Sequence, residues 1–208
     1  MKLSLLLKCA VLLLPVTLVT VVKSYAQNSG ITSKFYFPGG LGISYPFGNP
    51  HLDLKRGIML TTALEFRPVE GNALFIRFNY DAITNHYQQV YQNSPTNVTT
   101  GKLSSTIFSL GLGYRQKVGI FKVFGLLQPG IGINNYDRVH IDQGAISVNQ
   151  ISRSHLSFKV SGGLEYYLAQ HFAVTIEPSF FYLSPRGNYR LLNAQSFNLS
   201  MGFTTTLF

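Results

Sequence analysis

His155-Leu156-Ser157 is the segment whose residue types and spacing come nearest to a catalytic motif. A histidine and a serine two positions apart, together with a carboxylate, can supply the base, the nucleophile and the orienting group of acyl hydrolysis. Glu165 lies further along the same segment, roughly 26 Å away if the segment is a strand, and Glu177 belongs to the next segment. A three-residue match is common by chance. We therefore predict no catalytic residue and interpret His155 as a polar residue beside a loop.

The histidines and glycines do not form a recognisable ligand site either. No two histidines have the His-x-His or His-x₃-His spacing of a metal site. The glycine-rich run Gly39-Gly40-Leu41-Gly42 opens no helix, so a phosphate cradle is unsupported. We predict neither a metal nor a cofactor. We expect four histidines on or near polar loops, namely His51, His86, His140 and His155.

A two-residue alternation of side chains runs from about residue 34 to the last residue. In 171–183, for example, Phe172 and Val174 fall on one face while Ala173 and Thr175 fall on the other. A period of two is strand geometry. No other part of the chain is left to cover the apolar faces, and lipid tolerates a sheet only as a closed barrel. The alternating segments are 34–45, 56–67, 73–82, 103–116, 120–134, 154–168, 171–183 and 195–208.

The sequence therefore predicts an all-β chain, an eight-stranded antiparallel up-and-down transmembrane β-barrel. Its connections alternate between short turns and long polar loops, which is typical of a bacterial outer-membrane barrel. We predict an integral protein of that membrane. The expected turns are 68–72, 117–119 and 169–170, and the expected loops are 46–55, 83–102, 135–153 and 184–194.

Residues 1–26 have the composition of a cleaved signal peptide, which leaves 27–208 as one barrel domain. Basic Lys2 and Lys8 precede an apolar run, and Ser24-Tyr25-Ala26 is a small-x-small cleavage site. The single cysteine, Cys9, lies inside this leader. The formal net charge of +9 falls to +6 without the three leader lysines. These charges are dispersed, so we predict no nucleic-acid partner and expect an anionic membrane surface instead.

The face opposite the apolar one is polar, and it carries both signs of charge. Charges enclosed in a narrow barrel need partners, because an unpaired buried charge is costly. We predict an inward-facing charge network of Glu65, Arg77, Lys122, Lys159, Glu165 and Glu177. The same face also carries Arg67, Asp81 and Arg115. Phe124 and Leu126 share this polar parity, which indicates either a β-bulge or a partly apolar plug in the fifth strand.

Tyrosines and rim cations point to the two membrane surfaces. Tyrosines at strand ends form the interfacial girdles of a barrel. The expected girdle is Tyr45, Tyr80, Tyr114, Tyr166 and Tyr182, none of them in mid-strand. Basic residues at the outer rim can meet lipopolysaccharide phosphates, or they can simply solvate the loops. These residues are Lys55, Arg56, Arg186 and Arg190.

The leader ending Tyr25-Ala26-Gln27, the eight strands and the terminal Phe208 together resemble the small outer-membrane barrels of Bacteroidota often grouped as PorT-like. The architecture is also similar to that of the eight-stranded OmpA and OmpX barrels. The resemblance implies recognition by the barrel-assembly machinery, although Leu207 and Phe203 are one residue out of step with the usual terminal pattern. Two small-barrel families of this architecture are enzymes that act on lipid A.

Three functions stay open on the sequence. The first is a non-enzymatic barrel with a packed polar lumen, which stabilises the envelope, binds a partner through its loops or assists an export system. The second is a narrow pore for small solutes, which is disfavoured because eight strands leave an interior that side chains fill. The third is a lipid A-modifying enzyme. Long loops 83–102 and 135–153 carry the side-chain types favoured at binding hot spots, Tyr87, Tyr91, Tyr136 and Arg138.

Overall fold

The computed structural model describes residues 34–47, 53–68, 73–90, 98–142, 145–184 and 195–206. The expected leader 1–26, the loop arginines Arg186 and Arg190, the terminal Phe208 and His51 lie outside these residues. Within them, no helix is long and apolar enough to cross a membrane.

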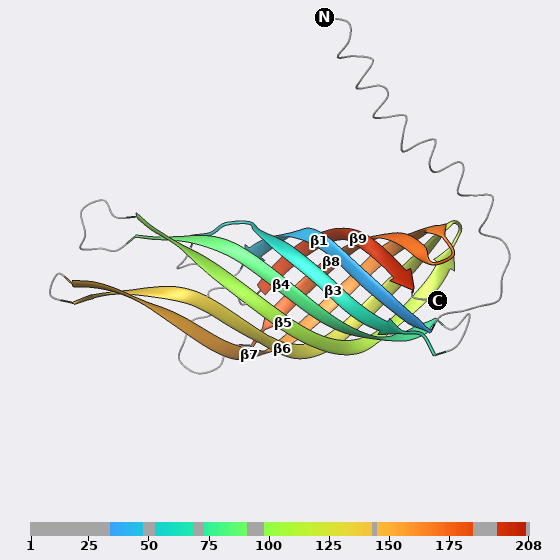
Figure 1. The fold of residues 1–208 in the computed structure, drawn as a ribbon, viewed down its shortest axis with the longest axis horizontal. Helices are drawn as coiled ribbons and strands as arrows, with labels where there is room; N and C mark the ends of the chain where they lie inside the picture. The colour runs from blue at the N-terminus through green and yellow to red at the C-terminus, as the bar shows by residue number, and fades with distance from the viewer. Residues whose placement is uncertain are drawn as a thin grey trace, which may run out of the picture.

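Eight antiparallel strands close into a barrel, and the predicted fold class is confirmed (Figure 1). Strand β1 pairs with both β3 and β9, and β4 pairs with β5, which completes the ring. The short β2 pairs with β4 beyond the start of β3 and adds no ninth position to the wall. The strands are β1 (Phe35–Phe47), β2 (Asp53–Leu54), β3 (Gly57–Phe66), β4 (Leu74–Val90), β5 (Val98–Val118), β6 (Phe121–Asp142), β7 (Ala145–Ala169), β8 (Phe172–Leu183) and β9 (Gln195–Thr206).

The alternation of side chains decides which face of each strand is buried. On β3, Met59 is 1% exposed and its neighbour Ile58 is 70% exposed. The outward faces of the other strands are equally rich in exposed Leu, Ile, Phe and Tyr. An apolar belt of this extent would not be tolerated on a soluble monomer, because contiguous exposed apolar patches there rarely exceed a few hundred Å². The belt is the lipid-facing wall.

Two of the expected loops are strands, so those predictions were wrong. Most of 83–102 belongs to the β4–β5 hairpin, and most of 135–153 belongs to the β6–β7 hairpin. Both hairpins extend beyond the other strands at one end of the barrel (Figure 1). A strand that has left the bilayer no longer needs an apolar outward face. Its polar composition therefore matches that of a loop, and alternation fails to reveal it.

Phe124 and Leu126 form an apolar plug rather than a bulge. The β6 register runs unbroken through both residues, and both are only 3% exposed. Phe124 packs edge-on against Phe75, with ring centroids 6.2 Å apart. Glycine makes room for each ring, since a Cβ at Gly113 would lie 2.1 Å from Phe75 and one at Gly163 would lie 2.5 Å from Phe124.

The girdle tyrosines lie on the outward face, with one departure from the expected positions. Tyr45 and Tyr182 lie next to the ends of β1 and β8, and both are exposed. Tyr114 and Tyr166 lie toward the short-turn ends of β5 and β7. Tyr80 is not at a strand end, because β4 continues ten residues past it to Val90. It is instead the last phenylalanine or tyrosine on the outward face of that strand among the described side chains.

Candidate functional site

The barrel lumen is crossed by a network of buried ion pairs that centres on Glu65 of β3. Glu65 is fully buried, and its carboxylate accepts hydrogen bonds from Arg67 at 2.5 Å and from Arg77 Nε at 2.7 Å. Arg115 Nη2 lies 2.8 Å from both Glu65 Oε1 and Glu165 Oε1. Three guanidinium groups thus share two carboxylates near the short-turn end of the barrel.

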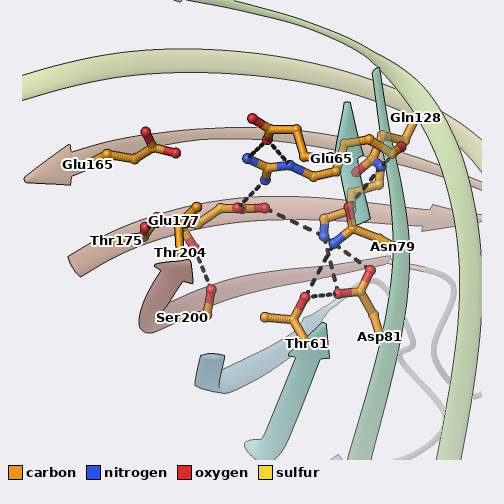
Figure 2. Close-up of polar contacts among 12 residues, drawn as sticks. Thr61, Glu65, Asn79, Asp81, Gln128, Glu165, Thr175, Glu177, Ser200 and Thr204 are labelled. Carbon is orange, nitrogen blue, oxygen red and sulfur yellow. Dashed lines mark hydrogen bonds and ion pairs between the residues drawn. The ribbon is translucent and has the colours of Figure 1, made fainter. Parts of the chain in front are cut away.

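Arg77 links this group to a second one near mid-barrel. Its Nη1 donates to Glu177 Oε2 at 2.8 Å (Figure 2). Lys159 Nζ lies 3.5 Å from Glu177 Oε1 and contacts both carboxylate oxygens of Asp81 at 3.2 and 3.1 Å. Thr61 also donates to Asp81 at 2.6 Å. The network therefore connects β3, β4, β5, β7 and β8 across the lumen.

Neutral polar side chains complete the wall around these charges. Gln128 Nε2 donates to Asn79 Oδ1 at 2.9 Å and to the Arg77 carbonyl at 3.0 Å. Asn79 in turn donates to Thr61 Oγ1 at 3.3 Å (Figure 2). Asn79 thus both accepts and donates a hydrogen bond, which limits its rotamers. Side chains held in this way fill the lumen as a packed core.

Aromatic faces support the buried cations. The Arg115 guanidinium lies 4.5 Å from the Phe75 ring centroid, and the Arg77 guanidinium lies 4.7 Å from the Phe124 centroid. Lys159 lies 5.1 Å from the Phe181 centroid. A cation over a ring face gains electrostatic stabilisation that increases when water is excluded. The apolar plug is therefore part of the charge network.

The structure brings together five of the six residues expected in the charge network, and Lys122 is the exception. Lys122 is half-buried and makes none of the ion pairs found among the described residues; its Nζ lies 4.2 Å from the Tyr167 centroid. Three network members were missing from the expected set: Arg67, Asp81 and Arg115. Their polar-face parity was the available signal. That parity shows which face of the sheet a side chain points to, but it does not show which charged groups form ion pairs.

An apolar cluster lies in the same lumen beside the charges. Met59, Ile83, Ile107, Phe181 and Leu183 are each at most 2% exposed and contact one another. No such cluster was predicted from the sequence, in which only Phe124 and Leu126 were identified as apolar residues on the polar face. A cavity of about 20 Å³ lies beside Arg77 and Glu177, which is room for roughly one water molecule.

The His-x-Ser pair does not form a catalytic arrangement. His155 and Ser157 point inward and Leu156 outward, as the alternation requires. His155 lies within β7 and is 5% exposed, so its placement beside a loop was wrong; the cause is the unexpected length of β7. The Ser157 hydroxyl is buried and makes no hydrogen bond within the described part of the chain. Glu165 and Glu177 are held by arginine and lysine side chains.

The structure places some of the residues expected at the outer rim or in loops as predicted and others in strands. Lys55 and Arg56 are exposed between β2 and β3. His86 is in β4 and His140 is in β6, so neither lies in a loop. No group of three or more His, Cys, Asp or Glu side chains that could hold a metal ion occurs among the described residues.

Tyr87, expected to be an exposed hot-spot residue, is buried. It is 5% exposed, its ring lies over Gly101 of β5, and its hydroxyl donates to the Asp137 carbonyl of β6 at 2.5 Å. The β5–β6 pairing ends at Leu103 and Tyr136, so Tyr87 joins the two hairpins just beyond their last backbone ladder. Tyr91 lies outside the described residues, as does the Arg138 side chain.

This closed, lipid-coated barrel can be compared with known proteins. A family model described as "Outer membrane protein beta-barrel domain" matches residues 14–204. The chain belongs to this family. It is therefore an integral protein of the outer membrane. No curated protein matches it.

Two solved structures, NspA and OprG, show the same fold at low sequence identity. Neisserial surface protein A (NspA) is 17% identical, with 84% of this chain and 98% of NspA covered at a TM-score of 0.53. OprG from Pseudomonas aeruginosa is 10% identical, with 82% and 94% covered at 0.53. The outer membrane protease OmpT from Escherichia coli is 9% identical, with 87% and 99% covered at a TM-score of 0.45.

Proposed function

We propose that this barrel is a non-enzymatic, non-conducting anchor that holds two joined hairpins outside the cell, where they bind a partner. The observation that carries the proposal is the filled lumen. Ion pairs, the Phe75–Phe124 plug and the apolar cluster at Met59 occupy the space through which a solute would pass. With its interior filled and its exterior coated by lipid, the protein meets soluble partners only at its rims.

The hairpins supply the surface for such a partner. Residues 85–90 of β4 pair with 98–103 of β5, and 135–142 of β6 pair with 145–152 of β7. At about 3.3 Å per residue, ladders of six and eight pairs are roughly 20 and 26 Å long, so they project beyond a membrane surface. Tyr87 fixes one hairpin against the other. A rigid projection loses little conformational entropy on binding, which favours a recognition role.

The finer role we propose is that of a PorT-like barrel of Bacteroidota, serving as an export-system accessory or an envelope stabiliser. This rests on the resemblance in the leader, the strand count and Phe208. Its further partners would be the barrel-assembly machinery and lipopolysaccharide. Exposed Lys55 and Arg56 at the outer rim supply charges for lipopolysaccharide phosphates.

Planar-bilayer conductance tests the filled lumen. The full chain should insert without steady current, because no continuous aqueous path crosses the ion-pair network. The variant Lys159→Gln combined with Glu177→Gln removes two adjacent charges that pair with each other, and it should raise the frequency of small current steps. Large, stable single-channel currents from the unmodified protein would reverse the proposal and favour the pore.

Two cellular measurements separate the remaining alternatives. Lipid A mass spectrometry with and without the gene should give the same acyl-chain pattern, and a gene-dependent change would favour the enzyme. Shortened hairpins should leave the amount of barrel in the outer membrane unchanged and should not restore the phenotype of a gene deletion. Full restoration by the shortened protein would move the function to the barrel wall or the short-turn rim.

A further inference from the structure

Two lysines face each other across the β5–β6 turn at the short-turn end of the barrel. Lys117 and Lys122 are direct cross-strand partners. Their Cβ atoms are then about 4.5–5.5 Å apart, and like charges in this position destabilise a sheet. Gly119 holds the turn with a φ of 62°, a conformation that L side chains rarely adopt. The turn fixes the register and keeps the two lysines opposite each other.

The neighbouring charges do not relieve this repulsion. The described acids at this end are Glu65 and Glu165, and both are already engaged by arginines. Glu165 is the cross-strand neighbour of Lys122, yet the two make no ion pair within 4 Å. Arg67 and Arg115 add two more cations at this end, and both contact Glu165, the cross-strand neighbour of Lys122. Among the residues that the structure describes, buried Arg115 Nε has no hydrogen-bond partner, so it can still donate a hydrogen bond.

The charge excess is specific to this end of the lumen. At mid-barrel, Arg77 and Lys159 are matched by Glu177 and Asp81 through contacts of 2.8 to 3.5 Å. At the short-turn end, Lys122 is half-buried and Lys117 is exposed, so both can be reached from the aqueous side. In outer-membrane barrels the short turns face the periplasm.

We propose that Lys117 and Lys122, backed by Arg67 and Arg115, bind a phosphate group at the periplasmic mouth of the barrel. A phosphate offers several charged acceptor oxygens and can bridge two ammonium groups with charge-assisted hydrogen bonds. The phosphate belongs either to a soluble periplasmic molecule or to the headgroup of an inner-leaflet phospholipid. This site is independent of the hairpins and of their proposed partner.

The test uses the full chain in lipid nanodiscs, with inorganic pyrophosphate as the soluble probe and phosphatidylglycerol as the lipid probe. Calorimetry in phosphatidylcholine nanodiscs should show one pyrophosphate per barrel. Native mass spectrometry of mixed nanodiscs should show phosphatidylglycerol retained if the headgroup is the ligand. Pyrophosphate binding alone assigns a soluble ligand, and retention of the lipid assigns the headgroup. If neither probe binds, the proposal is overturned.

Matched variants test which lysines bind the phosphate. Lys122→Gln should weaken binding about tenfold, since a hydrogen bond between charged groups is lost. Lys122→Glu should abolish binding, because it replaces a cation of the site with an anion that repels the phosphate. Lys34→Gln is the control, because Lys34 is exposed at the same end of the barrel but is not paired with Lys117 or Lys122. An equal loss from Lys34→Gln would mean diffuse attraction to a basic rim and would overturn the site.

Discussion

Strand β7 passes through two environments, and its side chains differ between them. From His155 to Lys159 exposed and buried residues alternate strictly, with Leu156 67% exposed and Lys159 1% exposed. From Asn149 to Ser154 no residue is buried, and three consecutive residues at the end of this stretch are exposed. The first stretch is wall between lipid and a packed lumen. The second is a hairpin wetted on both faces.

The comparison shows that the two parts of the molecule are held together differently. In the lumen, charged groups are isolated from water and depend on each other, so each loss leaves a partner uncompensated. In the hairpins, the backbone ladder persists, and none of the described side chains of the β6–β7 hairpin, 135–137 and 149–152, is buried. Stability should therefore be concentrated in the lumen, and the hairpins should tolerate change, as loop-like surface segments do.

The largest expected effect is from Arg77→Gln in the lumen. This change removes one of the three arginine partners of Glu65 and the closer of the two cationic partners of Glu177 in a buried setting, which should lower the free energy of unfolding by about 3–5 kcal/mol. Urea unfolding in detergent micelles, followed by the heat-modifiable gel shift of the folded barrel, measures it.

A control variant and a double variant complete this test. Arg56→Gln removes the same charge from an exposed position and should change the free energy of unfolding by less than about 0.5 kcal/mol. Adding Glu177→Gln to Arg77→Gln should recover part of the lost free energy of unfolding, because it removes the negative charge that has lost its arginine partner. Equal losses from Arg77→Gln and Arg56→Gln would show that the lumen network does not dominate stability.

Much of this architecture follows from the sequence, because a strand between lipid and a narrow lumen has only two environments to serve. Parity alone placed Glu65, Arg77 and Lys159 inside and Leu156 outside. Parity could not show that Arg67 and Arg115 would share two carboxylates, since that depends on strand stagger and side-chain rotamers. The same reasoning wrongly placed Tyr87 in a loop. Outside the membrane, a polar composition no longer distinguishes a paired strand from a loop.

The next effect in size is from Gly113→Ala, which tests the packing of the apolar plug. The added Cβ would lie 2.1 Å from Phe75, and overpacking of this kind costs about 1–3 kcal/mol. Gly125→Ala is the matched control, because nothing lies within 4 Å of its added Cβ. The same unfolding assay reads both. Equal stability of the two variants would mean that Phe75 moves aside freely and that the lumen is loosely filled.

A smaller and local effect is expected from Tyr87→Phe, which removes the hydrogen bond between the hairpins. The loss should be about 1 kcal/mol. It should appear as faster amide hydrogen exchange in the hairpins, with no change in the lumen strands, because the two regions open separately. Tyr45→Phe changes an exposed outward tyrosine and serves as the control. Faster exchange throughout the barrel would mean that hairpins and lumen form one cooperative unit.

The smallest effect on barrel stability should come from shortening both hairpins in register. Because Gln88 pairs with Thr100 and Arg138 pairs with Asn149, replacing 88–100 and 138–149 by Asn-Gly turns keeps every remaining β4–β5 and β6–β7 pair, although it removes the Asp53–Gln88 pair of β2. Tyr87 and Asp137 also stay in place, so the bond between the hairpins is retained. The free energy of unfolding should change by less than about 1 kcal/mol, since no lumen contact is removed. A loss of stability as large as that of Arg77→Gln would show that the projecting ladders support the barrel. Partner binding would then no longer explain why the hairpins are so long.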